Sequence, residues 1–424
     1  MSDTGFVLHG AVTWCEDPKS IRSFPDAYVV CVNGICRGVY EELPAEYANL
    51  PQEDFWDKLI IPGMTDLHTH APQYQFRGLH MDLELMDWLE QYAFPEEAAY
   101  KRRLYAERAY DLFVEELYCG ATTRAVIFAT KHVGATLRLM DLLEETGLVT
   151  YVGKVNMDRN VPDYYCETTE ESLAATKKWL KKAEGRYERT SPILTPRFTP
   201  ACSRERLAGL AELRKEYRLP VQSHVSESPQ EIELVRELEK GISCYADSYD
   251  RCGLLGAEPK TVLAHGVWSD ETEIALLAER GVFLAHCPQS NWNVRSGIAP
   301  VRKFLDAGVP VGLGSDVAGG STTSIFTAMK DAVQASKMYW RYVCPDEAPL
   351  TLPEVFYMAT KGGGAFFGNV GSFEPGYEFD AVVLDDSAYP TMRELTPAER
   401  LERLLYLSDD RAIVGKYVRG SRLY

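Results

Sequence analysis

The sequence predicts an α/β protein, a (β/α)8 TIM-like barrel with a small β-sandwich domain formed by the N- and C-terminal segments. Two observations lead to this fold class. After residue 60, short apolar runs alternate eight times with longer segments of helical periodicity. Before residue 60 and after residue 370, the chain instead has short runs typical of strands. Eight strand–helix units favour a closed barrel, whereas an open doubly wound sheet is the alternative. No Gly-x-Gly-x-x-Gly follows a strand to support that alternative.

The barrel units follow one another without a long linker. The eight strands are predicted at residues 59–68, 125–128, 149–155, 193–195, 220–224, 261–265, 282–286 and 309–316. Helices between them are predicted at residues 101–118, 137–145, 172–183, 204–217, 229–240, 271–280 and 301–307. Gly120 and Gly147 stand where two of these helices should end.

The two ends of the chain are predicted to pair with each other. Residues 5–12 and 27–32 have the composition of strands, and Asn33-Gly34 is a hairpin-turn signal. Residues 379–384 and 418–423 are the corresponding strands near the C-terminus. We therefore expect residues 1–60 and 370–424 to form a composite β-sandwich domain, and residues 61–369 to form the barrel.

Composition limits the classes of partner. The chain of 424 residues has 45 basic and 62 acidic residues, a net charge of −17, which disfavours nucleic acids and anionic membranes. Ten cysteines without a Cys-x-x-Cys pair indicate reduced thiols. There is no N-terminal signal and no apolar segment long enough to span a bilayer. These features predict a cytoplasmic protein and do not exclude small neutral substrates.

The run from Pro62 to His70 is the most informative motif. Side chains alternate along a strand, so His68 and His70 point to the same side. Two neighbouring imidazoles at a strand end can hold one metal ion, and zinc prefers such ligands. The alternative is a pair of unrelated histidines near a loop.

Further polar residues stand at the predicted strand ends, where barrel active sites lie. His224, His265 and His286 end three strands, so five of the eight histidines occupy such positions. Asp316 ends the last strand. We predict that one metal is bound by the set His68, His70, His224 and Asp316. An open position for water would make the site catalytic, because the metal lowers the pKa of that water.

Glu227, His265 and Asp316 are the predicted catalytic residues. Glu227, three residues after His224, is placed to carry a proton between water and substrate. It could instead serve the N-terminus of the next helix electrostatically. Asp316 could likewise be a helix N-cap rather than a ligand. His265 could contact the water or the substrate or bind the metal, and His286 is expected behind the site.

These stretches resemble the amidohydrolase superfamily, and in particular members that act on guanine. The similarity is carried by residues 62–74, 88–95, 196–200, 224–227, 264–266, 286–291, 312–320 and 406–411. The histidine motif and the strand-end ligands imply only metal-assisted hydrolysis. Residues 71–73, 88–95 and 197–198 point to guanine. The strand-4 end carries Arg197 and no lysine, so the resemblance implies one metal rather than two.

The resemblance also implies roles for substrate-binding residues. Gln73 and Arg197 would hydrogen-bond the purine edge, with Arg197 at the 6-oxo group. Phe198 would stack on the ring and Trp88 would close the pocket, although both could simply pack in the core. The implied activity is hydrolytic deamination of guanine to xanthine and ammonia, in purine catabolism or salvage. The metal would be zinc, with iron as the alternative, and the assembly a homodimer.

Two other functions remain open on the sequence. One is a deaminase or chlorohydrolase acting on another aminated heterocycle, such as 8-oxoguanine, an aminotriazine or an adenosine derivative. The other is a binding protein that keeps the fold without catalysis. The full set of ligand candidates disfavours the second.

Overall fold

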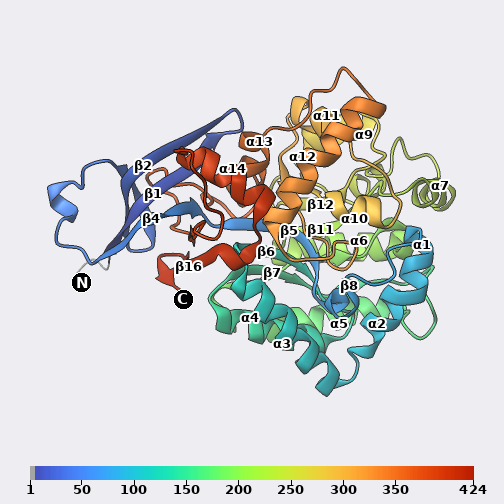
Figure 1. The fold of residues 1–424 in the computed structure, drawn as a ribbon. Coiled ribbons are helices and arrows are strands. Elements are labelled where there is room, and N and C mark those ends of the chain that lie inside the picture. Colours follow the sequence, from blue (N-terminus) through green and yellow to red (C-terminus); the bar gives the residue numbers. More distant parts are fainter. Residues whose placement is uncertain (1–4) are drawn as a thin grey trace.

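A barrel of parallel strands is the centre of the computed structural model, which describes residues 5–424 (Figure 1). Its strands are β5 (Met64–His70), β6 (Thr122–Phe128), β7 (Val149–Gly153), β8 (Val155–Asn156), β9 (Thr190–Pro192), β10 (Thr195–Pro196), β11 (Val221–Val225), β12 (Thr261–His265), β13 (Phe283–His286) and β14 (Val311–Leu313). They form the parallel sheets β5-β6-β7-β9 and β11-β12-β13-β14 and the short pair β8-β10. The third and fourth barrel strands are thus each divided in two. The predicted barrel is confirmed.

The barrel closes through two seams. Leu194 forms a parallel bridge with Val221, which joins the fourth strand to β11. At the other seam, the Asp316 amide donates to the His68 carbonyl at 2.9 Å. The His70 amide donates to the Val317 carbonyl at 3.2 Å. The second seam therefore brings the first and last strands together where the predicted metal ligands lie.

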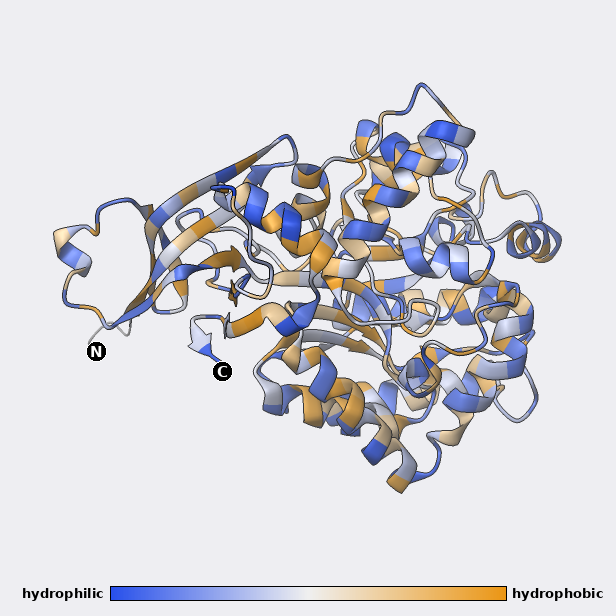
Figure 2. Cartoon of the chain, in the orientation of Figure 1, coloured by the Kyte–Doolittle hydropathy of each residue, from blue (hydrophilic) through white to orange (hydrophobic). Residues whose placement is uncertain are grey.

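Helices surround the barrel, and the last two in the chain also pack against the sheet that the chain ends form, as Figure 1 shows. They are α1 (Leu85–Trp88), α2 (Phe94–Ala99), α3 (Arg103–Cys119), α4 (Val133–Thr146), α5 (Thr169–Ala183), α6 (Arg204–Tyr217), α7 (Pro229–Leu238), α8 (Asp247–Asp250), α9 (Glu271–Arg280), α10 (Pro288–Asn293), α11 (Val301–Asp306), α12 (Ile325–Tyr342), α13 (Leu352–Tyr357) and α14 (Pro397–Leu407). A π-helical turn, η3 (Leu89–Ala93), joins α1 to α2. Hydrophobic and hydrophilic residues both occur around these helices (Figure 2).

The seven predicted helices are present within a few residues of their predicted ends. Capping boxes explain why two of them begin where they do. Thr168 and Glu171 cap α5, and Ser228 and Glu231 cap α7. Helices α1, α2, α8, α10, α12, α13 and α14 were not predicted. Five of them are only four to six residues long, too short for helical periodicity to stand out.

The two ends of the chain share one sheet of seven strands in the order β17-β16-β15-β4-β1-β2-β3. Its strands are β1 (Gly5–Asp17), β2 (Ser20–Val32), β3 (Ile35–Tyr40), β4 (Gln52–Pro62), β15 (Ala381–Leu384), β16 (Ile413–Val418) and β17 (Ser421–Arg422). The N-terminal β4 pairs in antiparallel fashion with the C-terminal β15. Asn33 and Gly34 form the predicted turn, both with positive φ.

Several strand boundaries were predicted wrongly. Leu59 to Ile61 lie in β4 of the terminal sheet, and the barrel strand β5 begins only at Met64. The chain passes between the two sheets at Gly63, where a Cβ would lie 2.4 Å from the Thr123 side chain. The predicted strand at 418–423 is interrupted by Arg419 and Gly420, which have positive φ. The domain boundaries near residues 60 and 370 stay a prediction.

No helix within residues 5–424 combines the length and the hydropathy that a bilayer-spanning helix needs.

Candidate metal and substrate site

Four predicted ligands from three parts of the barrel meet around one point. His68 and His70 come from β5, His224 from β11, and Asp316 follows β14. The His70 Nε2 atom lies 3.2 Å from the Nε2 atoms of both His68 and His224. The Asp316 Oδ1 atom lies 3.2 Å from His68 Nε2 and 3.5 Å from His70 Nε2. All four residues are buried.

These separations fit four side chains that share one metal ion, which can take water as a fifth ligand. Bonds of about 2.0–2.1 Å to four tetrahedral ligands place the ligand atoms roughly 3.3 Å from one another. Imidazole nitrogens turned toward each other at 3.2 Å repel through their lone pairs unless a cation or proton lies between them. Groups of histidines and Asp316 with ligand atoms within 4.8 Å of one another are present here. The donor set therefore suits a divalent ion such as Zn²⁺ or Fe²⁺.

The protonation of the histidines also suits metal binding. Burial, with a smaller effect of His68, holds the pKa of His70 well below its usual value. Burial and the neighbouring histidines do the same for the pKa of His224. Both rings are therefore neutral, as ligation requires. The His224 Nδ1 lies 2.5 Å from the Arg197 carbonyl oxygen, to which it must donate. The hydrogen of the neutral ring is therefore on Nδ1, and Nε2 carries the lone pair that can bind a metal.

Asp316 carries the negative charge of the site. Burial by itself would raise the pKa of this carboxyl. The adjacent His68 and the nearby His265 and His70 outweigh burial and hold its pKa well below the usual value. Asp316 is not a helix cap, because the next helix, α12, begins only at Ile325. The structure thus excludes the alternative that Asp316 is a helix N-cap.

The backbone at the strand ends is held in unusual conformations. Ser226, His265 and Asp316 have φ angles of 45°, 81° and 46°. Such positive values cost non-glycine residues on the order of 1–3 kcal/mol and are typical of functional sites. Asp66 supports one of these turns, because its carboxylate accepts from the Ser315 amide at 3.1 Å and the Ser315 hydroxyl at 2.5 Å. It also accepts from the His68 amide at 3.1 Å.

Close packing between strands β5 and β14 requires a glycine. A Cβ on Gly314 would lie 2.7 Å from Cys287 Sγ and 2.9 Å from His68 Cβ. Any larger residue would displace a metal-ligand candidate. His286, which the sequence placed behind the site, is buried there, and burial lowers its pKa to about 3.

Glu227 and His265 form the next part of the site. His265 Nε2 lies 3.4 Å from Glu227 Oε2 and 3.8 Å from Asp316 Oδ2. The other ring nitrogen, Nδ1, lies 2.9 Å from Asn291 Oδ1, which orients the imidazole. Burial and the nearby Asp316 raise the pKa of Glu227 well above its usual value. A carboxyl with a raised pKa beside a water-activating metal can both accept and return a proton.

The alternative role of Glu227 at a helix N-terminus is taken by other residues. Ser228 and Glu231 form the capping box of α7. Glu231 accepts from the Glu227 amide at 3.0 Å and from Tyr245 at 2.6 Å. Burial and Glu227 raise the pKa of Glu231 to about 7. The Glu227 side chain accepts one hydrogen bond, from the Ser296 hydroxyl at 3.4 Å, and it lines the cavity.

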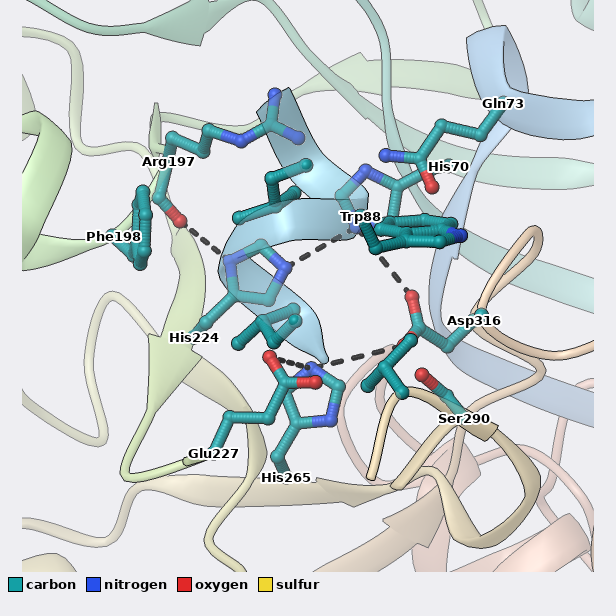
Figure 3. A pocket seen from close by; sticks show the side chains of 14 residues that line it. His70, Gln73, Trp88, Arg197, Phe198, His224, Glu227, His265, Ser290 and Asp316 are labelled. Carbon is teal, nitrogen blue, oxygen red and sulfur yellow. Dashed lines mark hydrogen bonds and ion pairs between the residues drawn. The ribbon is translucent and has the colours of Figure 1, made fainter. Parts of the chain in front are cut away.

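One cavity joins three of the four metal-ligand candidates to the predicted substrate residues, and Figure 3 shows the side chains around it. It is lined by His70, Gln73, Leu85, Trp88, Leu89, Arg197, Phe198, His224, Glu227, His265, Ser290, Val294, Asp316 and Gly319. All predicted substrate-binding residues are thus in one place. In Figure 3, Arg197 and Gln73 lie toward one end of this cavity, and Glu227 and His265 toward the other.

Several residues of the site were not predicted. Leu85, Leu89 and Val294 give it an apolar wall, and Ser290 adds a hydroxyl. Glu97 lies just behind the cavity and binds Arg197. Glu96 and Glu97 are adjacent acidic residues, and both lie in the first turn of α2. The sequence alone therefore does not distinguish them. Asn291 and Ser290 stand in the stretch 286–291 that carries the resemblance, so that stretch was the available signal.

Comparison with known proteins agrees with this geometry. The sequence model that defines the amidohydrolase family matches residues 59–423 of this chain. This chain belongs to the amidohydrolase family. A crystal structure of guanine deaminase from C. acetobutylicum, with guanine bound in its active site, is 43% identical and has a TM-score of 0.96. The match covers 99% of this chain and 100% of that one.

Other relatives extend the comparison within the amidohydrolase family. Guanine deaminase of Dictyostelium discoideum is 36% identical over 379 residues, which are 87% of this chain and 83% of the relative. A triazine hydrolase from Arthrobacter is only 19% identical, over 99% of this chain and 94% of the other, with a TM-score of 0.85. That likeness concerns the fold alone.

Proposed function

We propose that this amidohydrolase hydrolyses guanine to xanthine and ammonia with a metal-activated water. The observation that carries the proposal is the 43% identity, over essentially both whole chains, to a guanine deaminase with guanine in its active site. The cavity supports it, because metal-ligand, proton-carrying and purine-edge candidates line the same space.

His68, His70, His224 and Asp316 are proposed to hold one ion. When bound, the ion activates water for attack near neutral pH and stabilises negative charge that develops during the reaction. His224 is kept in the ligating tautomer by the Arg197 carbonyl. His265, fixed by Asn291, is proposed to hydrogen-bond the attacking water beside Asp316.

Glu227 is proposed to carry the protons. Water adds to C2 of guanine, so a C–O bond forms while Glu227 takes a proton from the water and passes it to a ring nitrogen. Glu227 then takes the second proton from the new hydroxyl at C2 and gives it to the exocyclic amine, so the C2–N bond breaks as the C2–O bond becomes a carbonyl. Ammonia leaves and the ring retains the oxygen as xanthine. The raised pKa of Glu227 suits a group that must hold and release a proton in each cycle.

The purine is proposed to lie between Phe198 and the apolar wall that includes Trp88. Phe198 approaches the His224 ring in an edge-on arrangement, with centroids 6.4 Å apart. Arg197 and Gln73 are proposed to donate to the purine edge, with Arg197 at the 6-oxo group. The Trp88 ring packs against Phe76, with centroids 5.4 Å apart, so it closes the cavity on one side.

An ammonia-release assay tests the proposal. Purified protein is offered guanine, 8-oxoguanine, cytosine, adenosine and an aminotriazine in parallel, with Glu227→Ala as the inactive control. We expect guanine to have the highest kcat/KM and the control to release none above background. Higher kcat/KM for another heterocycle would replace guanine as the substrate. Release from none of them, by protein that contains metal, would reject catalysis.

We further propose that the ion is zinc, that two chains form a homodimer, and that the protein works in the cytoplasm. Zinc is supported by the three imidazole ligands. A reducing compartment is supported by ten cysteines that are all unpaired. Elemental analysis and sedimentation of the purified protein test the first two proposals.

A further inference from the structure

A buried carboxylate behind the cavity holds both predicted purine-edge donors. Glu97 of α2 has no solvent-exposed surface and does not line the cavity. Its Oε2 accepts from Arg197 Nη1 at 2.5 Å, and its Oε1 accepts from Arg197 Nη2 at 2.9 Å. The same Oε1 accepts from Gln73 Nε2 at 2.9 Å. Tyr165 donates to Oε2 at 3.1 Å.

These four hydrogen bonds leave Glu97 no capacity for a ligand. A carboxylate has about four acceptor sites, two on each oxygen, and each Glu97 oxygen already receives two donors. Glu97 therefore acts through Arg197 and Gln73. The fork of the guanidinium is fixed by both its terminal nitrogens, which is the most directional form of such a pair.

The hydrogen bonds also decide what the two donors can offer the cavity. Two of the five N–H groups of Arg197 are taken by Glu97, and Nη1 also contacts Met157 Sδ at 3.9 Å. The Nε–H makes no hydrogen bond within residues 5–424. Gln73 has its carbonyl oxygen engaged by the Ala318 amide at 3.2 Å and one amide hydrogen engaged by Glu97. Its second amide hydrogen remains. The orientation of Gln73 follows, because Glu97 accepts only from the NH₂ group.

We propose that Glu97 is a specificity-determining positioning residue, which gives this end of the cavity N–H donors and so selects purines with an oxo group at C6. A purine with hydrogen or an amino group at that position would leave buried donors unpaired, which is costly. Glu97 belongs to the same short segment, α1 to α2, as Trp88 and Leu89, so one segment supplies both the wall and the support of the donors. The inference rests on the proposed function.

The neighbouring Glu96 provides a matched control. It is half-buried, and its carboxylate accepts from the Tyr105 hydroxyl rather than from a cavity residue. Glu96→Gln and Glu97→Gln thus make the same chemical change one residue apart. The two substrates are guanine and 2-aminopurine, which is guanine without its 6-oxo group. The measured quantity is the ratio of their kcat/KM values.

We expect Glu97→Gln to lower the ratio of kcat/KM for guanine to kcat/KM for 2-aminopurine roughly 10- to 100-fold. This factor corresponds to the free energy that one hydrogen bond from a charged donor contributes. Glu96→Gln should leave the ratio unchanged, and zinc content should be equal in all proteins. A parallel fall for both substrates, with the ratio unchanged, would mean that Glu97 only supports the fold and would overturn the inference.

Two further arms keep the test decisive. If Glu97→Gln does not fold, Glu97→Asp retains the charge but is one methylene shorter, and it should lower the ratio to a smaller extent. An unchanged ratio there rejects the inference. Calorimetry of hypoxanthine and purine binding to wild type and to Glu97→Gln measures the same preference for a 6-oxo group without turnover. If wild-type protein releases no ammonia from guanine, the proposed function fails. The ratio of these two binding constants, compared between wild type and Glu97→Gln, still decides the role of Glu97.

Discussion

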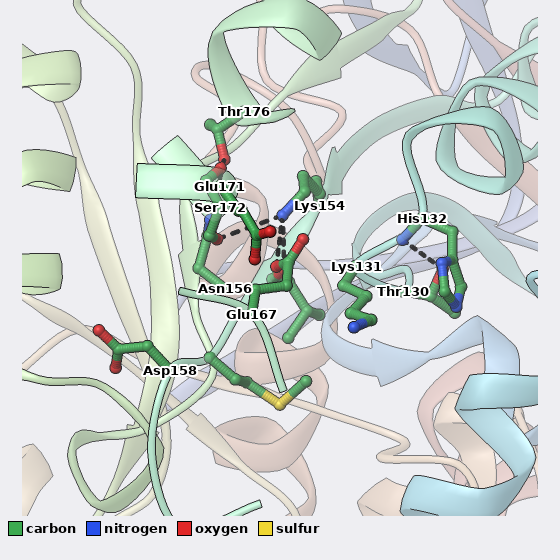
Figure 4. A network of polar contacts seen from close by, with 12 residues as sticks. Thr130, Lys131, His132, Lys154, Asn156, Asp158, Glu167, Glu171, Ser172 and Thr176 are labelled. Carbon is green, nitrogen blue, oxygen red and sulfur yellow. Dashed lines mark hydrogen bonds and ion pairs between the residues drawn. The ribbon is translucent and has the colours of Figure 1, made fainter. Parts of the chain in front are cut away.

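Two buried pairs of opposite charge lie at neighbouring barrel strands, and they differ in what the protein leaves for a ligand. Arg197 with Glu97 follows the fourth strand. Lys154 with Glu167 lies within the divided third strand, between β7 and β8 (Figure 4). Both cations are fully buried or nearly so.

The Lys154 ammonium is fully hydrogen-bonded within the protein. Its ammonium donates to the Val155 carbonyl at 3.1 Å, to Glu167 Oε2 at 3.1 Å and to Ser172 Oγ at 3.4 Å. Three donors are all that an ammonium has. Asn156 extends the network to Thr176 at 2.8 Å. The ammonium has no hydrogen left for a ligand, and among the buried atoms of this network only Asn156 Oδ1 has no partner within the described residues. We infer that the network stabilises the divided third strand.

Arg197 is left incomplete, and so is the metal cluster next to it. The Arg197 Nε–H makes no hydrogen bond within the described residues, and the lone pairs of His68, His70 and His224 face one another. Buried polar groups are normally satisfied. Burial and charge alone therefore do not identify a binding site in this barrel. Buried polar atoms that face one cavity and have no hydrogen-bond partner do identify one.

Removing the proton carrier should have the largest effect. Glu227→Gln keeps the shape of the side chain but cannot accept and return a proton. We expect kcat for guanine to fall about 10²- to 10⁴-fold, with zinc content unchanged. Ammonia release and elemental analysis on the same samples measure both. Activity within tenfold of wild type would place the proton carrier elsewhere.

Changing the incomplete pair while keeping its charge should have the next largest effect. Arg197→Lys retains a cation for Glu97 but loses the fork and the Nε–H. We expect kcat/KM for guanine to fall roughly 10- to 100-fold, and kcat/KM for 2-aminopurine to fall less. Equal losses for both substrates would contradict a contact with the 6-oxo group.

Changing the Lys154 network should affect stability rather than activity. Lys154→Met fills a similar volume but leaves the Glu167 carboxylate without its cation. We expect the free energy of unfolding to fall by about 1–3 kcal/mol, and kcat/KM for guanine to stay within about threefold of wild type. Urea unfolding and steady-state kinetics measure the two quantities. A selective loss of guanine turnover would put Lys154 in the site.

The same network should give the smallest signal, a pH dependence of stability. Burial, partly offset by Glu167, lowers the pKa of Lys154 from 10.5 to about 8. Between these values the unfolded chain binds more protons than the folded one, so raising the pH favours folding. Relative to Lys154→Met, wild type should gain about 2 kcal/mol between pH 7.5 and 9.5. A constant difference in unfolding free energy would show that Lys154 titrates normally.

The sequence was sufficient for features set by local pattern. Alternating strands and helices predicted the barrel, and histidines at strand ends predicted that His68, His70, His224 and His265 converge. Asp316 and Glu227 had competing local roles, and only the positions of α7 and α12 decided between them.

Features set by packing between distant segments could not be predicted. Glu97 and Glu96 are equivalent in sequence, and only the fold turns one toward Arg197, 100 residues away. The split between β4 and β5 depends on the approach of Thr123 to Gly63. Asp66 looks like an ordinary strand residue until Ser315, from the loop after the last barrel strand, donates to it.

Metal reconstitution tests the central claim most directly, namely that four side chains hold one ion that activates water for guanine. Protein freed of metal with a chelator is titrated with Zn²⁺ while ammonia release from guanine is followed. We predict no release without metal and a linear rise that ends at one equivalent per chain. Full activity in the metal-free protein, or a rise that ends only at two equivalents, would contradict the account.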